Sequence, residues 1–207
     1  MKAAENNSTE QQIITAAKQI FIEKGFAETS MSDIAARVGI NRPGLHYYFR
    51  TKEKMFEAVF SDIVHSFMPA IQNIIQQDIP ITERIAEIVN VYFDTMQKEP
   101  CLPIFILREI QRDTPHLINT IRKLDTVQYI SIIREILLSE MEKGKLKRIS
   151  LEFIFNTFYG LLFFPFLSKP LTDIIFKGAD NADFSNKLEQ WKVHIIRQME
   201  YLLRPKE

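Results

Sequence analysis

The sequence predicts an all-α fold of about nine helices. Apolar residues recur at helical spacing along nearly all of the 207 residues, and no alternation of apolar and polar residues is long enough to predict a strand. The chain has 6 Gly against 16 Phe, which argues against a fold built from many turns. We expect two parts, with three short helices in residues 1–51 and longer helices in residues 52–207.

The composition is that of a soluble globular protein, with 46% hydrophobic and 25% charged residues. Lys plus Arg and Asp plus Glu are both 26, so the zero net charge excludes a polycationic nucleic-acid coat but allows a local basic patch. The single Cys101 cannot form a disulfide framework, and the polar start of the chain lacks a secretory signal. The apolar stretch 153–167 is interrupted by Asn156 and Pro165 and is too short for a bilayer span. We therefore expect a cytoplasmic protein with no membrane partner.

The first helix carries one inward stripe and ends at Gly25, because glycine takes the left-handed cap conformation without steric cost. That stripe consists of Ile13, Ala17, Ile20 and Phe21. Each of the next three helices begins after a residue whose side-chain oxygen can cap the free amides of the first turn. These caps are Ser30, Asn41 and Thr51. Ser30 and Asp33 form a capping box.

The later helices are predicted from apolar periodicity and from breaks at Gly, Pro and capping residues. Thr114 as cap and Pro115 as first helical residue open one long helix that ends near Gly144. Ser150 opens an aromatic-rich helix, and Asp183 opens the last one. The expected ranges are 81–98, 102–112, 115–143 and 151–167, with the final helix after residue 183.

The second and third helices are spaced as a helix-turn-helix. Gly39 permits the tight turn between them, and Leu45 anchors the third helix inward. From Arg37 to Lys54 there are five basic residues and one acidic residue, a net charge of +4 that predicts a phosphate partner. The outward face of the third helix is formed by Arg42, Pro43, His46 and Tyr47.

The run from Ile34 to Lys52 resembles the DNA-binding domain of the TetR family of transcriptional regulators, because its capping, turn and aromatic positions agree at once. The resemblance covers residues 13–60 and implies that the third helix enters the major groove while the second contacts the backbone. Gly44 stands where many members have Thr or Ser, so a hydroxyl contact is absent there. The residues that the resemblance assigns to DNA binding are Ser30, Met31, Ser32, Arg42, Pro43, Gly44, His46, Tyr47, Tyr48 and Lys52. Residues 1–51 would be the DNA-binding domain.

The resemblance implies that residues 52–207 bind a small molecule and form a homodimer. The aromatic-rich helix is apolar on all sides, so more than one of its faces must be covered. With the last helix it could form a two-fold four-helix interface, although both helices could instead complete a monomeric core. The expected interface residues are Phe155, Tyr159, Leu162, Leu188, Trp191 and Ile195.

A ligand pocket is implied among the middle helices, where Met and aromatic residues gather. A plain core is the alternative for each of these residues, and a surface salt bridge is the alternative for Glu109. An aromatic, Met-rich lining favours a hydrophobic or amphipathic effector. The expected lining residues are Phe67, Tyr92, Met96, Phe105, Glu109, Tyr129 and Phe158.

Together with the resemblance, these features predict a homodimeric, ligand-responsive transcriptional regulator that binds a palindromic DNA operator. The resemblance implies a repressor, because members of the family are more often repressors than activators. The sequence lacks a Walker loop, a dinucleotide fingerprint, a His-Glu-x-x-His motif and a nucleophile elbow, so we expect no catalytic residues and no enzyme activity. His65, His116 and His194 have no ligand spacing, so no metal and no cofactor is expected. The alternative is a helical carrier of lipids or small molecules without a DNA function.

Overall fold

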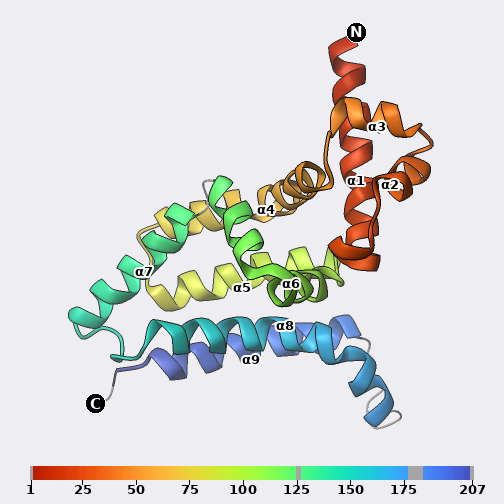
Figure 1. The fold of residues 1–207 in the computed structure, drawn as a ribbon. Helices are drawn as coiled ribbons and strands as arrows, with labels where there is room; N and C mark the ends of the chain where they lie inside the picture. The colour runs from red at the N-terminus through yellow and green to blue at the C-terminus, as the bar shows by residue number, and fades with distance from the viewer. Residues whose placement is uncertain (1, 125–126, 177–183, 206–207) are drawn as a thin grey trace. The chain divides into compact units, whose positions relative to one another are not determined.

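The computed structural model describes residues 2–124, 127–176 and 184–205, and within these ranges it contains nine α-helices and no strand. The prediction of an all-α fold is confirmed (Figure 1). The helices are α1 Lys2–Glu28, α2 Met31–Val38, α3 Arg42–Tyr48, α4 Lys52–Gln76, α5 Ile81–Lys98, α6 Leu102–Lys123, α7 Val127–Glu142, α8 Leu151–Ile175 and α9 Phe184–Leu203.

The chain divides into two compact units. Unit 1 consists of Met1–Ser66 and Ile104–Leu124, and unit 2 consists of Phe67–Pro103 and Asp125–Glu207. The first change of unit falls inside α4 and the second inside α6, so both helices contribute residues to each unit. The expected boundary after residue 51 separates DNA binding from ligand binding and dimerisation, and it stays a prediction.

Unit 1 is built around aromatic side chains of α1, α4 and α6. The predicted inward stripe of α1 is buried from Ile13 to Phe21. Gly25 interrupts the helix with φ 81° and ψ 169°, so the predicted break occurs there, although helical residues continue to Glu28. Beyond this break Phe26 packs edge-on against Phe56 of α4, with ring centroids 5.2 Å apart. Phe56 also contacts Phe105 of α6 at 5.8 Å, and residues of α6 thereby complete the core of unit 1.

Two cations cover the Phe26 ring. The Lys52 Nζ atom lies 4.5 Å from the ring centroid and donates to the carbonyl oxygens of Phe26 and Ala27. The Arg112 guanidinium lies 4.3 Å from the same centroid, a distance at which the ring face attracts a cation. Arg112 also donates to Glu109 Oε2 from Nε at 2.8 Å and from Nη2 at 2.6 Å. Glu109 is 1% exposed, so this pair supplies the partner that a buried carboxylate requires.

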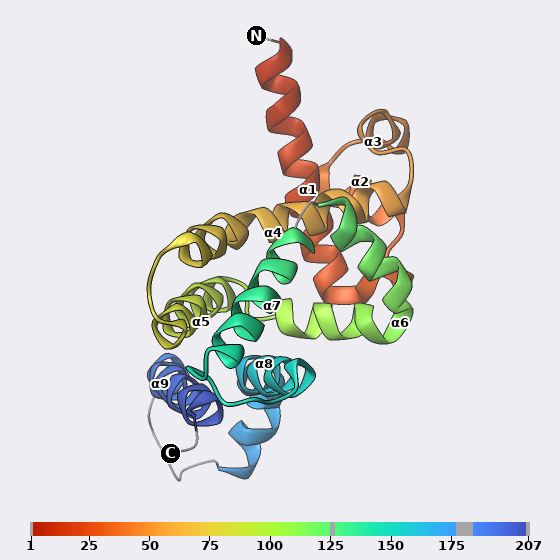
Figure 2. The ribbon, with the colours of Figure 1, turned by 90° about the vertical axis from the view of Figure 1, so that its left-hand side faces the viewer.

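Unit 2 has its core between α5, α8 and α9, and α8 and α9 run side by side (Figures 1 and 2). Trp191 of α9 ties these two helices by donating from Nε1 to the Leu161 carbonyl oxygen at 2.9 Å. The core cluster includes the buried residues Val89, Phe93, Met96, Leu162, Phe166, Leu188, Ile195, Met199 and Leu203.

The long helix predicted over 115–143 is wrong. The structure ends α6 at Lys123 and begins α7 at Val127, and the two helices belong largely to different units. The cap before Pro115 also lies one residue earlier than predicted. Asp113 is non-helical and its Oδ1 accepts from the His116 amide at 2.9 Å, while the Thr114 hydroxyl donates to the Ile110 carbonyl. The cap predicted at Asp183 lies outside the described residues.

The aromatic-rich helix is longer than the range 151–167. It continues through Pro165 and Pro170 to Ile175, because a proline inside a helix removes only one amide donor and can be accommodated by a bend. The argument that this stretch is too short for a bilayer is therefore wrong. By length and composition alone, Leu151–Ile175 is the one helix in the described part of the chain that could cross a membrane, and a core helix passes the same test.

Candidate DNA-binding surface and ligand pocket

The turn between α2 and α3 follows from local chemistry. Ser30 Oγ accepts from the Asp33 amide at 3.1 Å, and Asp33 Oδ2 accepts from the Ser30 amide at 3.0 Å, which completes the predicted capping box. These hydrogen bonds from Ser30, with help from the Lys24 ammonium, lower the pKa of Asp33. Gly39 ends α2 with φ 79° and ψ 24°, a left-handed conformation that favours glycine. Asn41 caps α3 through Oδ1, which accepts from the Gly44 amide at 2.7 Å.

The two faces of α3 differ sharply. Leu45 and the following Phe49 are buried in unit 1, as predicted, and they fix the rotation of the short helix. Tyr47 on the opposite side is 76% exposed, and Arg42 and Pro43 are exposed at the start of the same helix. An exposed tyrosine and an exposed arginine on the same short helix leave a stacking surface and hydrogen-bond donors open to a partner.

Arg42 is held by a chain of hydrogen bonds along α3. Its Nε donates to His46 Nε2 at 3.3 Å, and His46 Nδ1 lies 3.1 Å from the Arg50 carbonyl oxygen. Since Nε2 accepts, the neutral imidazole must carry its proton on Nδ1, which then donates to Arg50. His46 therefore orients the guanidinium of Arg42 before any partner arrives.

The other predicted DNA contacts lie in several environments. Tyr48 is half-buried and meets the Tyr47 ring edge-on at 5.2 Å, whereas Ser32 is exposed at the start of α2. Met31 has a buried side chain, so only its backbone amide could reach a phosphate. The Lys52 ammonium is turned toward the end of α1, and its contact with a phosphate stays a prediction.

Gly44 lies close to the α3 cap. A Cβ placed there would lie 3.0 Å from Asn41 Oδ1, the oxygen that already accepts from the Gly44 amide. A side chain at this position would press on the Asn41 cap of α3. This contact is a structural reason for glycine at a position where many family members have Thr or Ser.

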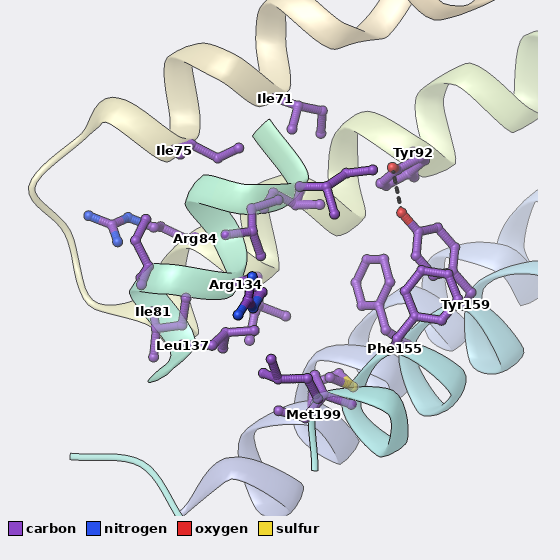
Figure 3. A pocket seen from close by; sticks show the side chains of 18 of the residues that line it. Ile71, Ile75, Ile81, Arg84, Tyr92, Arg134, Leu137, Phe155, Tyr159 and Met199 are labelled. Carbon is purple, nitrogen blue, oxygen red and sulfur yellow. Dashed lines mark hydrogen bonds between the residues drawn. The ribbon is translucent and has the colours of Figure 1, made fainter. Parts of the chain in front are cut away.

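Unit 2 contains a cavity of about 470 Å³ between α4, α5, α7 and α8 (Figure 3). This volume falls in the range of small-molecule sites in proteins. Its walls are mostly branched aliphatic and aromatic side chains, with few polar groups. The lining consists of Ile71, Ile75, Ile81, Arg84, Ile85, Ile88, Tyr92, Ile130, Ile133, Arg134, Ile136, Leu137, Leu151, Glu152, Ile154, Phe155, Phe158, Tyr159 and Met199.

The Tyr92 and Tyr159 hydroxyls form a hydrogen-bonded pair in the cavity wall, with their oxygens 3.0 Å apart. Burial raises the pKa of Tyr92 well above its ordinary value, and the neighbouring Tyr159 adds to the shift. Burial raises the pKa of Tyr159 as well. Both hydroxyls are therefore neutral at physiological pH, and each can donate or accept a hydrogen bond.

A family model described as bacterial regulatory proteins of the tetR family matches residues 13–59, which include all of α2 and α3. The fatty acid metabolism regulator protein of Bacillus subtilis (strain 168) is 24% identical over 151 residues, which are 70% of this chain and 77% of that protein. Residues 13–59 of this chain are therefore a DNA-binding domain of the TetR type. The HTH-type transcriptional repressor BdcR of Escherichia coli (strain K12) is 32% identical to this chain over 80 residues, 39% of the chain and 41% of that protein.

The TetR-like fold extends beyond the matched domain. The crystal structure of the transcriptional regulator FadR from Bacillus subtilis in complex with stearoyl-CoA superposes with a TM-score of 0.69 and 18% identity. The superposition covers 91% of this chain and 96% of that one. At this level of identity the likeness establishes the fold.

The lining of the cavity includes two of the predicted ligand residues, Tyr92 and Phe158. Phe67 packs on the Tyr92 ring at 5.4 Å, and Met96 is buried in the core cluster of unit 2. Tyr129 is half-buried outside the lining. The prediction that Phe105 and Glu109 line the pocket is wrong, because both lie in the core of unit 1. There Phe105 packs on Phe56, and Glu109 pairs with Arg112.

Three of the six expected dimer residues need correction, because Leu162, Leu188 and Ile195 are buried in the core of a single chain. Trp191 is half-buried and bonded to the Leu161 carbonyl, and Tyr159 pairs with Tyr92. Phe155 is exposed, but it also lines the cavity. The apolar side chains that α8 and α9 leave exposed include instead Phe153, Phe164, Leu171, Val193 and Tyr201.

Sequence reasoning missed both cavity arginines, although a signal was present. Arg84 falls on the apolar stripe that contains Ile81, Ile85 and Ile88 at helical spacing. Arg134 falls in the same way between Ile133 and Leu137. A basic residue inside an apolar stripe indicates a buried partner or a ligand.

Proposed function

We propose that this protein is a homodimeric, ligand-responsive repressor that binds a palindromic operator through α2 and α3. The observation that carries the proposal is the exposed surface of α3, which presents Tyr47 and an Arg42 that is bonded to His46, while Leu45 anchors the helix in the core. A short helix with one face fixed in this way can enter the major groove without changing its own packing. We expect the protein to act in the cytoplasm, without a catalytic role.

Arg42 is the best candidate for direct readout of a base pair. A guanidinium can bind guanine O6 and N7 in bidentate fashion, which is worth ~1–3 kcal/mol of discrimination. Tyr47 and Pro43 would pack against thymine methyls or sugars, and the amides at the start of α2 would contact phosphates. Arg50, which is exposed just after α3, adds a further positive charge next to the helix.

The effector in this proposal is a hydrophobic or amphipathic molecule in the cavity of unit 2. FadR, a relative in fold, was crystallised with stearoyl-CoA, an amphipathic ligand. Residues of α4 take part in both functions, since Lys52 contacts Phe26 in unit 1 while Ile71 and Ile75 line the cavity in unit 2. A ligand that shifts α4 would change the separation of the two recognition helices of a dimer. Full switching from 99:1 to 1:99 needs ~5.5 kcal/mol of preference between the two states.

For the dimer we propose the exposed stripe of α8 rather than the residues buried in the core. Phe153, Gly160, Phe164 and Leu171 recur at helical spacing and are all exposed. Packing of this stripe against its two-fold copy would bury the phenylalanines. A homodimer would present two recognition helices to the half-sites of a palindrome, which lie ~34–36 Å apart.

The test is selection of bound duplexes from a random DNA pool, followed by fluorescence anisotropy on the selected sequence. Arg42→Ala and Tyr47→Ala should each weaken specific binding about tenfold or more, while circular dichroism and sedimentation stay unchanged. Arg122→Ala serves as the control, because Arg122 is an exposed arginine of α6 in the same unit. Unchanged affinity in both α3 variants would overturn the proposal. Failure to select any duplex, together with tight binding of small molecules, would favour the carrier without a DNA function.

A further inference from the structure

The cavity of unit 2 is polar at two separate places and apolar between them. Figure 3 shows Arg84 and Arg134 toward one side of the cavity and the bonded Tyr92–Tyr159 pair toward the other. Ile71 and Leu137 are among the aliphatic side chains that line the space along with them. A ligand that satisfies all of these groups must be long, with an apolar body and a distinct head.

Arg84 has a donor that the protein leaves unused. Its Nη2 donates to the Gln77 carbonyl oxygen, but its Nε is buried and has no hydrogen-bond partner among the residues that the structure describes. Buried donors in folded proteins are nearly always paired, so an unpaired one calls for an explanation. Deprotonation cannot remove the unpaired donor, because a guanidinium stays charged at every physiological pH.

Arg134 adds a second positive charge to the cavity lining and is itself exposed to solvent. It makes no ion pair with any residue in the described part of the chain. Glu152 is the one acidic residue among the lining side chains that the structure describes, so the two arginines give the lining a net charge of +1. The charge that complements this lining is negative.

The apolar part sets the size of the ligand. The cavity volume of about 470 Å³ lies in the range of small-molecule sites. A site of this size can take one linear chain with a small head.

We propose that the effector is a single-chain amphipathic anion whose oxyanion head, a carboxylate or a phosphate, pairs with Arg84 and Arg134. Planar guanidinium groups bind both kinds of oxyanion through paired N–H donors. The chain lies among the isoleucines and reaches toward the tyrosine pair, whose neutral hydroxyls need no ion there. This assignment names the ligand class of the effector site that the proposed function requires.

The test measures ligand binding by titration calorimetry on the full-length protein without DNA, at concentrations where the probes do not form micelles. The probes are dodecanoate, dodecyl phosphate, dodecanol and dodecyltrimethylammonium, which share one chain length and differ in the head. One or both anions should bind at least about tenfold more tightly than the alcohol, and the cation more weakly still. The two anionic arms decide between a carboxylate and a phosphate head.

Arg84→Gln and Arg134→Gln should each remove most of the preference for the anion while leaving dodecanol affinity within about twofold. Arg197→Gln, which changes an exposed arginine of α9 outside the cavity lining, should keep the preference. Equal affinity for anion and alcohol in the natural protein would overturn the inference. The absence of binding by all four probes, or an anion preference that survives both cavity variants, would also overturn it. Loss of DNA binding with intact anion selectivity would overturn the regulator proposal alone.

Discussion

Removal of Arg112 should destabilise the protein strongly, because it leaves the buried carboxylate of Glu109 without its partner. Glu109 is 1% exposed, and its Oε2 accepts two hydrogen bonds from Arg112, whose own side chain is 26% exposed. Breaking one partner of a buried ion pair costs ~3–5 kcal/mol. Partial exposure of the guanidinium places Arg112→Ala at the lower end, about 3 kcal/mol, and part of that is the lost contact with the Phe26 ring.

The measurement is urea unfolding followed by far-UV circular dichroism. The double variant Glu109→Leu with Arg112→Met removes both charges and keeps apolar volume, so it should lose less stability than Arg112→Ala alone. Arg37→Ala is the matched control, since its bond to Glu23 at 3.2 Å joins two exposed side chains and should contribute no more than ~1 kcal/mol. The prediction is refuted if Arg112→Ala lowers the free energy of unfolding no more than Arg37→Ala does. It is also refuted if the double variant is less stable than Arg112→Ala.

Two further predictions concern the Gly39 turn and acid stability. Gly39→Ala should cost ~1–2 kcal/mol, because alanine is strained at φ 79° although no atom lies within 4 Å of the added Cβ. An unchanged urea midpoint would contradict this backbone argument. The lowered pKa of Asp33 means that its bonds to Ser30 stabilise the fold above the ordinary carboxyl pKa of ~3.9 and lose that effect as the pH falls through the lowered value. Asp33→Asn should therefore reduce the loss of stability between neutral and acid pH, and an unchanged slope in pH-dependent urea midpoints would exclude this role.

The helix-turn-helix could be predicted almost residue by residue because its determinants are local. The Ser30 capping box, the Gly39 turn and the Asn41 cap each depend on groups a few residues apart in the chain. The inward position of Leu45 follows from helical spacing once the turn is known.

The ligand and dimer residues could not be predicted in the same way, because an apolar stripe does not reveal what covers it. Leu188 and Ile195 would show the same spacing in a dimer interface and in the core of one chain, and the structure places them in the core. Phe105 and Glu109 share one helix with residues of unit 2, yet they pack in unit 1, and this assignment depends on tertiary contacts. Isoleucines contribute much of the cavity lining, and a prediction based on Met and aromatic residues does not include them.

The discontinuous make-up of unit 1 limits how the DNA-reading half can be engineered. A fragment that stops at Ser66 would lack Ile104–Leu124, and with it the side chains of Phe105 and Arg112 that cover Phe56 and Phe26. Such a fragment would expose two phenylalanines to water and lose part of its core. A chimera that exchanges operator specificity between relatives must therefore transplant two stretches of chain together, or replace only the surface residues of α3.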